Sequence, residues 1–191
     1  ETTLFRKGHL LYALHQARRA MVEAREAILC EGQLDVIRCH LAGLLTAVAA
    51  QGTAFTPDHA RLIKRYADSV VIVFDADRAG QDAALRAADT FVQVGLAVRI
   101  AALPEGEDPD SLIRRPGGAE AFRKRLAEAA SALDFQIDVL SAREPPKTEA
   151  ARLRLASAVV AAIARAPTAV QQAVLAQRAA ERLGLPVDAI R

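Results

Sequence analysis

The fold of this chain is decided by the stretch Val70-Val71-Ile72-Val73-Phe74-Asp75-Ala76-Asp77, an apolar run that ends in two aspartates. An unbroken apolar run of this length is typical of a strand that is covered on both faces of a parallel sheet. Further apolar runs at residues 28–30, 46–50 and 98–103 alternate with segments of helical periodicity. This alternation predicts a doubly wound α/β fold over residues 27–130, with a parallel sheet flanked by helices.

Carboxylates follow three of the four predicted strands. They are Glu31 and Asp35 after the first strand, Asp75 and Asp77 after the third, and Asp108 and Asp110 in the loop after the fourth. The second strand runs instead into Gly52-Thr53. Because parallel strands end at a shared edge, where ligands bind, we expect the acids to converge. Magnesium and manganese ions prefer oxygen ligands, so the pattern predicts a divalent-metal site.

A simpler interpretation is that the acids cap the helices that follow the strands, because carboxylates are favourable at helix N-termini. Asp35 and Asp77 fit this interpretation. Glu31 and Asp75 fit it less well, since each directly follows strand residues that are expected to be buried. Like charges packed at neighbouring strand ends are destabilising without a cation, and this favours the metal site.

The rest of the chain is expected to be helical. Helical periodicity precedes the sheet at residues 10–26, and beyond residue 119 it recurs at 120–130, 132–141, 149–165 and 168–183. Prolines and glycines separate these last segments. We therefore expect a segment at residues 1–26 that leads into the α/β domain of residues 27–130, followed by a small helical subdomain at residues 131–191.

The composition excludes several classes of protein. Hydrophobic residues make up 52% of the chain and charged residues 25%, as in a packed domain rather than a disordered one. No apolar run reaches the ~20 residues of a membrane span, whereas a net charge of +2 neither demands nor excludes nucleic acid. Cys30 and Cys39 lack zinc-site spacing and are expected to be buried thiols in a reducing cytosol. The chain starts without Met, so we expect a fragment of a longer intracellular protein.

Four motifs, in order, resemble the TOPRIM domain. They are Glu31-Gly32-Gln33-Leu34-Asp35, Gln51-Gly52-Thr53-Ala54, Phe74-Asp75-Ala76-Asp77-Arg78-Ala79-Gly80 and Leu103-Pro104-Glu105-Gly106-Glu107-Asp108-Pro109-Asp110. TOPRIM topoisomerases and nucleases share the Glu and the Asp-x-Asp, whereas the Arg-Ala-Gly, the Gly-Thr loop and the Glu-Asp-Pro-Asp loop resemble bacterial DNA primases of the DnaG type. The opening at residues 1–8 and the helical tail also resemble the primase catalytic core. Gln33 stands where this family commonly has an aromatic residue.

The resemblance implies a DNA-directed RNA polymerase activity, the synthesis of RNA primers on single-stranded DNA during replication. It implies Mg²⁺, for which Mn²⁺ can substitute, and no zinc in this fragment. Asp75 and Asp77 would be the central metal ligands and Glu31 a further ligand or acid–base group, these three being catalytic. Asp35, Asp108 and Asp110 would complete neighbouring metal positions. The residues implied to contact nucleotide or nucleic acid are Arg6, Lys7, Gly52, Thr53 and Arg78.

The resemblance implies partners as well. They are the single-stranded DNA template, ribonucleoside triphosphates and the RNA primer, with the replicative helicase and single-strand-binding protein engaged through regions outside this chain. The implied place is the replication fork in the bacterial cytoplasm, and no membrane is implied. Two other functions stay open: phosphodiester cleavage by a TOPRIM nuclease or topoisomerase, and a non-catalytic TOPRIM-like nucleic-acid interaction module. The fragment alone is expected to be weakly active or inactive.

Overall fold

The predicted parallel sheet is confirmed in a computed structural model of the chain, which describes residue 2 and residues 6–190. The strands β1 (Glu26–Cys30), β2 (Ala47–Ala49), β3 (Ser69–Val73) and β4 (Ala97–Ile100) lie in the order β2-β1-β3-β4. β1 pairs in parallel with β2 and β3, and β3 with β4. Cys30 lies opposite Val73, so the residues that follow β1 and β3 leave the sheet at the same edge.

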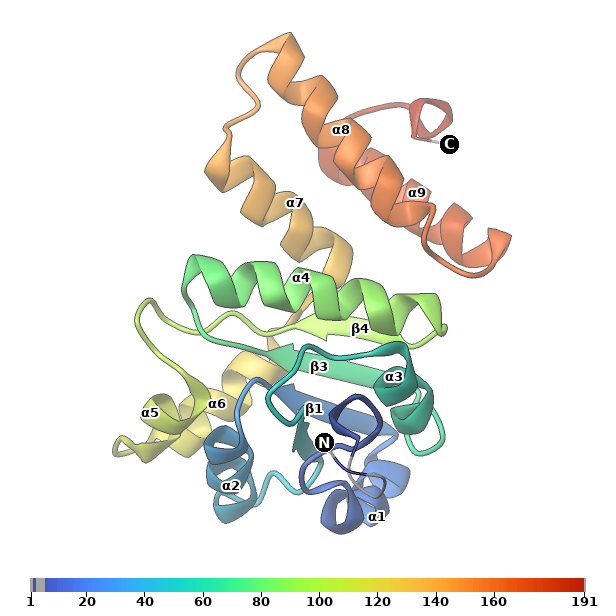
Figure 1. Cartoon of the computed structure of the whole chain (residues 1–191). Helices are drawn as coiled ribbons and strands as arrows, with labels where there is room; N and C mark the ends of the chain where they lie inside the picture. Colours follow the sequence, from blue (N-terminus) through green and yellow to red (C-terminus); the bar gives the residue numbers. More distant parts are fainter. Residues whose placement is uncertain (1, 3–5, 191) are drawn as a thin grey trace. The chain divides into compact units, whose positions relative to one another are not determined.

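Helices cover both faces of this sheet (Figure 1). Along the chain they are α1 (Leu14–Ala24), α2 (Gln33–Leu41), α3 (Pro57–Ile63), α4 (Arg78–Gln93), α5 (Pro109–Arg114) and α6 (Gly118–Ala127). One core cluster joins Ile28, Cys30, Val71 and Val73 of the sheet to buried residues of α2, α5 and α6. The alternate strand residues, such as Ile72, are also fully buried, because α4 covers the opposite face. Burial on both faces explains why these strands are apolar throughout.

The segment before the sheet differs from the expected helix over residues 10–26. The first helix of the described residues is the short η1 (Lys7–His9), and helix α1 spans only Leu14–Ala24. Tyr12 N–H donates a 2.8 Å hydrogen bond to the Ala49 carbonyl of β2, and Ala13 has a left-handed φ of 63°. Because a helix requires negative φ, α1 begins after Ala13. The primase-like opening at residues 1–8 lies partly outside the described residues.

Strand β4 is shorter than the predicted run of residues 98–103. The Ala101 N–H still donates to the Ile72 carbonyl at 2.9 Å, but β3 ends one residue later, at Val73. A strand needs a neighbour for its backbone groups, so residues 102–108 leave the sheet as a loop. Of the two aspartates that the sequence places after the fourth strand, Asp108 ends this loop and Asp110 lies in the first turn of α5.

The chain divides into two compact units, residues 1–129 and residues 130–191. The second unit contains α7 (Ala132–Arg143), α8 (Glu149–Ile163), α9 (Ala169–Leu183) and the short helix η2 (Val187–Ala189). It also contains a two-residue strand, β5 (Ala130–Ser131), so the expectation of helices alone beyond residue 119 is wrong. The assignment of these units to named subdomains of a primase core remains a prediction.

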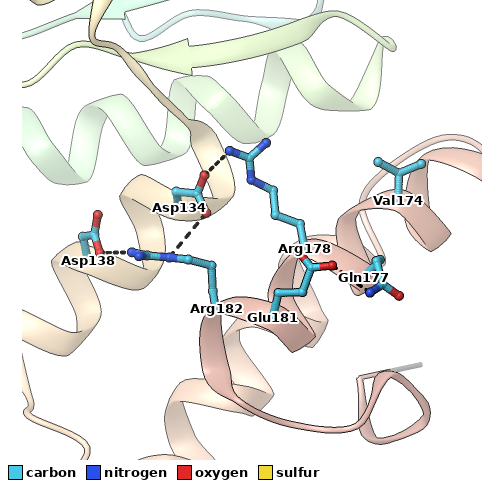
Figure 2. Close-up of a pocket in the computed structure, with 7 residues that line it drawn as sticks. All are labelled: Asp134, Asp138, Val174, Gln177, Arg178, Glu181 and Arg182. Atoms are coloured by element: carbon cyan, nitrogen blue, oxygen red, sulfur yellow. Dashed lines mark hydrogen bonds and ion pairs between the residues drawn. The ribbon is translucent and has the colours of Figure 1, made fainter.

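The helical unit is held by an apolar core and by one cluster of ion pairs. Leu155, Val159 and Ile163, spaced by four residues on α8, pack against buried residues of α7 and α9. Figure 2 shows the ion pairs between α7 and α9, in which Asp134 contacts both Arg178 and Arg182. The side chain of Asp134 is only 13% exposed, so these pairs compensate a largely buried charge. No helix in the described part of the chain is long and apolar enough to cross a membrane.

Candidate metal centre

The two aspartates of the Asp-x-Asp motif lie where β3 turns into α4. Asp75 is half-buried one residue beyond Phe74, whereas Asp77 is exposed and is the N-cap of α4. Asp77 Oδ1 accepts a 2.7 Å hydrogen bond from the Gly80 N–H, which confirms the capping interpretation for this residue. A cap uses one carboxylate oxygen and leaves the second for another ligand, so capping and metal binding are compatible at Asp77.

Electrostatics link the strand-end acids to one another. Desolvation, followed by repulsion from Asp75 and Asp77, raises the pKa of Glu31, although a backbone N–H of Asp75 and the cation of Arg86 act against this. Desolvation, followed by repulsion from Asp108 and Asp77, raises the pKa of Asp75. Because these carboxylates repel one another, a cation placed among them would stabilise them.

Asp35 is the most buried of the candidate ligands, with 8% of its surface exposed. Its carboxylate accepts hydrogen bonds from the Gly32 N–H at 3.0 Å and from the Asp110 N–H at 3.2 Å. These bonds lower its pKa, but desolvation outweighs them and, with repulsion from Asp108 and Asp75, raises the pKa to about 6. Asp35 therefore joins the start of α2 to the start of α5 at an energetic cost.

The two aspartates at the start of α5 differ in their surroundings. Asp108 is the N-cap of α5 and accepts a 2.6 Å hydrogen bond from the Ser111 N–H. Asp110 forms ion pairs with Arg38 of α2, at 2.7 Å, and with Arg114. The hydrogen bond from Arg38 is the main reason why the pKa of Asp110 is lowered. Asp110 already has two cationic partners, so it fits a metal ligand less well than Asp75 does.

Glu107 is a buried acid that sequence reasoning missed. It is 7% exposed, accepts a 2.6 Å hydrogen bond from the Ser111 hydroxyl and pairs with Arg115. Its backbone carbonyl also accepts from the Ala76 N–H at 3.2 Å, which ties this loop to the Asp-x-Asp turn. The only sequence signal was its place in an acid-rich loop, because its arginine partner follows eight positions later.

The residues predicted to contact nucleotide or nucleic acid fall into three places. Arg6 and Lys7 are exposed at η1, Gly52 and Thr53 are exposed after β2, and Arg78 is exposed as the first residue of α4. Lys7 and Gly52 are brought together, since a Cβ atom on Gly52 would lie 3.9 Å from Lys7 Nζ. Gly52 has a φ of +67°, which favours glycine and allows this close approach.

The donor set fits a divalent cation in its chemistry. Among the residues described, no group of three or more His, Cys, Asp or Glu side chains could hold a metal ion as the side chains stand. Magnesium, however, is usually bound through one or two carboxylates together with waters and substrate phosphates. Glu31, Asp75 and Asp77 supply carboxylate oxygens that repel one another, and a hard cation would relieve that repulsion.

Replacement of Asp35 by Asn is expected to stabilise the metal-free chain at about pH 8, by about 1 kcal/mol. Removal of the buried charge contributes up to about 3 kcal/mol, but the amide has one acceptor oxygen and loses one of the two hydrogen bonds from the Gly32 and Asp110 N–H groups. The folded-state pKa of Asp35, about 6, lies above its ordinary value of 3.8, so the ionised carboxylate opposes folding at high pH. Protonation removes this opposition as the pH falls through about 6, and the advantage of the variant disappears below about pH 4. Urea unfolding in the presence of a chelator measures the difference. A variant that is less stable than the parent at pH 8 would contradict the expectation.

The sheet and its acidic edge define a Toprim-like protein, and a family model described as Toprim-like matches residues 28–113. Toprim domains of primases bind divalent metals in general. The chain belongs to the family of bacterial DNA primases of the DnaG type, and it corresponds to the Toprim-containing part of their catalytic core.

The relative and the structures that support this assignment each match 97% or more of the chain. The DNA primase of Halalkalibacterium halodurans is 36% identical over 192 residues, which is 100% of this chain and 32% of that protein. A DNA primase domain from Pseudomonas aeruginosa superposes with a TM-score of 0.84 at 34% identity, covering 100% of this chain and 60% of that one. A DnaG primase catalytic domain bound to ssDNA gives 0.84 and 34%, covering 97% of this chain and 59% of that one. The chain spans about a third of the length of the curated relatives it matches.

A second family model changes one expectation. It is described as the DnaB-helicase binding domain of primase, and it matches residues 133–188, which form α7, α8, α9 and η2. The expectation that the helicase-binding region lies wholly outside this chain is therefore corrected. The catalytic-core structures also cover these residues, so the helical unit matches both the helicase-binding family model and the primase catalytic core.

Proposed function

We propose that this chain carries the metal-binding part of a primase active site, and that the protein joins ribonucleotides into a primer on a single-stranded DNA template. The observation that carries the proposal is the acidic edge itself, where repulsion from Asp75 and Asp77 contributes to the raised pKa of Glu31 and repulsion from Asp77 contributes to that of Asp75. The relative whose catalytic domain is bound to ssDNA supports the choice of template. Mg²⁺ is the proposed ion, with Mn²⁺ as a substitute.

In this proposal the 3′-hydroxyl oxygen of the primer attacks the α-phosphorus of the incoming triphosphate, and the bond to pyrophosphate breaks. Divalent ions, when bound, lower the pKa of the hydroxyl and neutralise the leaving group. Asp75 and Asp77 would hold the ions, and Glu31, whose raised pKa suits a proton acceptor, would bind an ion or take the hydroxyl proton. Asp35, Asp108 and Asp110 would support neighbouring ion positions.

Phosphate groups of the nucleotide or the strands would be bound by the cationic and backbone groups around η1 and the neighbouring loops. Lys7 and Gly52, which lie side by side, are the centre of this proposed region, and Arg6, Thr53 and Arg78 are the further exposed residues proposed to contact phosphate. We further propose that residues 133–188 contact the replicative helicase, that single-strand-binding protein is a partner of the longer protein, and that the protein acts at the bacterial replication fork.

Extension of a labelled RNA primer annealed to DNA, in the presence of ribonucleotides and Mn²⁺, tests the proposed reaction. We expect slow, metal-dependent extension by the parent chain and a loss of at least about 100-fold in the Asp75→Asn variant. Asp68→Asn is a matched control, because Asp68 precedes β3 at the opposite edge of the sheet. Shortening of the labelled strand would instead support a nuclease, and metal binding without either reaction would support an interaction module.

A further inference from the structure

The η1 turn that carries Lys7 is stabilised by contacts with another element of the fold. Helix η1 spans three residues, Lys7–His9, and none of them is fully buried. A single 3-10 turn of this length has few hydrogen bonds of its own and does not persist without tertiary contacts. The position of Lys7 therefore depends on what binds the backbone of the turn.

The first turn of α3 supplies those contacts. The Thr56 hydroxyl donates a 2.6 Å hydrogen bond to the Gly8 carbonyl. The His59 ring lies with Nε2 at 2.9 Å from the Lys7 carbonyl, and its Nδ1 accepts from the Thr56 N–H at 3.2 Å. Because Nδ1 accepts, Nε2 carries the proton and donates to Lys7, so His59 is a neutral bridge between the cap of α3 and the Lys7 turn. His59 is fully buried, and desolvation lowers its pKa, in agreement with the neutral form.

A chain of ring contacts continues from His59 to the acidic edge. The rings of His59 and Phe55 meet edge to face at 5.9 Å, and Phe55 stacks on Phe74 at 6.1 Å. Phe74 directly precedes Asp75. Rings packed in a buried cluster have few alternative positions. These side chains therefore fix the position of the Lys7 backbone relative to the end of β3.

We propose that His59 is a positioning residue, which fixes the Lys7 turn so that the Lys7 ammonium meets a phosphate group beside the Gly52 loop. The proposal rests on the proposed function, in which Lys7 contacts a phosphate of a nucleic-acid strand or of a nucleoside triphosphate. The sequence offered no signal for this role, since His59 lies 52 residues from Lys7 and is not spaced as a metal ligand from another histidine.

Two substitutions of His59 separate positioning from packing. His59→Asn keeps an acceptor near Nδ1 for the Thr56 N–H but is too short to reach the Lys7 carbonyl. His59→Gln extends an amide donor to about the place of Nε2 and restores that bond. His40→Asn is a matched control, because His40 lies on α2 and its Nε2 also lies 2.9 Å from a backbone carbonyl, that of Ala47 in β2.

Binding of a fluorescent dT oligonucleotide, followed by anisotropy over a series of salt concentrations, provides the readout. We expect Lys7→Ala to weaken binding about fivefold and to reduce the salt slope by about 0.7, as for one lost phosphate contact. His59→Asn should reproduce most of both effects, His59→Gln and His40→Asn should resemble the parent, and the Lys7→Ala/His59→Asn double variant should bind no more weakly than Lys7→Ala. A parallel titration with a labelled ribonucleoside triphosphate shows which source supplies the phosphate.

The outcomes distinguish the phosphate-binding role of Lys7 from the positioning role of His59. If Lys7→Ala leaves both the oligonucleotide and the triphosphate affinities unchanged, the phosphate role of Lys7 in the proposed function fails, and the positioning role fails with it. If Lys7→Ala weakens binding but His59→Asn does not, or if the two losses are additive, Lys7 retains its role and His59 is a packing residue only. Equal losses in His59→Asn and His59→Gln would also overturn the positioning role.

Discussion

Replacing Asp75 and Asp77 together by Asn is expected to weaken the binding of Mn²⁺ to this chain at least about 100-fold while the protein remains folded. Loss of groups that only orient metal ligands already costs about 10- to 100-fold in metal affinity, so loss of two ligands should cost no less. The substitutions keep side-chain volume, and the amide oxygen of the asparagine that replaces Asp77 could still accept from the Gly80 N–H. Calorimetric titration measures the binding and circular dichroism the fold.

The control for this experiment removes two carboxylates from the other edge of the sheet. Glu26 begins β1 and pairs with Arg99, and Asp68 precedes β3 and pairs with Arg25. A Glu26→Gln/Asp68→Asn variant therefore makes the same change in net charge without altering the strand-end acids. Equal Mn²⁺ affinity in the parent and in the Asp75→Asn/Asp77→Asn variant would contradict the metal site, as would binding by neither protein at millimolar Mn²⁺.

Replacing Gly80 by Ala is expected to destabilise the chain by about 3 kcal/mol and to lower its metal affinity, although no carboxylate is removed. A Cβ atom on Gly80 would lie 2.3 Å from the Asp75 carbonyl oxygen and 3.0 Å from the Asp75 carbonyl carbon. Both are backbone atoms, so relief of the clash requires movement of the Asp-x-Asp turn away from the first turn of α4. Alanine's higher helix propensity, about 1 kcal/mol, offsets only part of this cost.

Gly8→Ala is the matched control for that substitution. Its Cβ would lie 3.5 Å from Thr56 Cγ2, which is an ordinary van der Waals contact. Its effect on stability should stay within about 1 kcal/mol. Urea unfolding and Mn²⁺ titration of both variants measure the two effects. Unchanged stability of Gly80→Ala would show that the Asp75 backbone can move freely, and the close approach would then have no part in holding the acids.

Much of the site follows from local patterns. The apolar run ending at Phe74 specified a strand covered on both faces, and the alternation of strands with helices specified their parallel direction. Parallel strands end at one edge, so Glu31 and Asp75 could be placed near each other without coordinates. The capping roles of Asp35 and Asp77 were also predicted from the sequence, because a cap depends on residues three positions apart.

The tertiary structure decided which charges are compensated and which are left to repel one another. Arg38 neutralises Asp110 from 72 positions away, Arg115 pairs with the buried Glu107, and His59 binds the backbone of Lys7 from another element. Such pairs depend on how helices pack against the sheet, and no periodicity in the sequence encodes them. The sequence alone determined the sheet and the acids at its edge, because strand patterns and parallel connections are local. Packing over long sequence separations determined the rest, leaving the pKa values of Glu31, Asp35 and Asp75 raised.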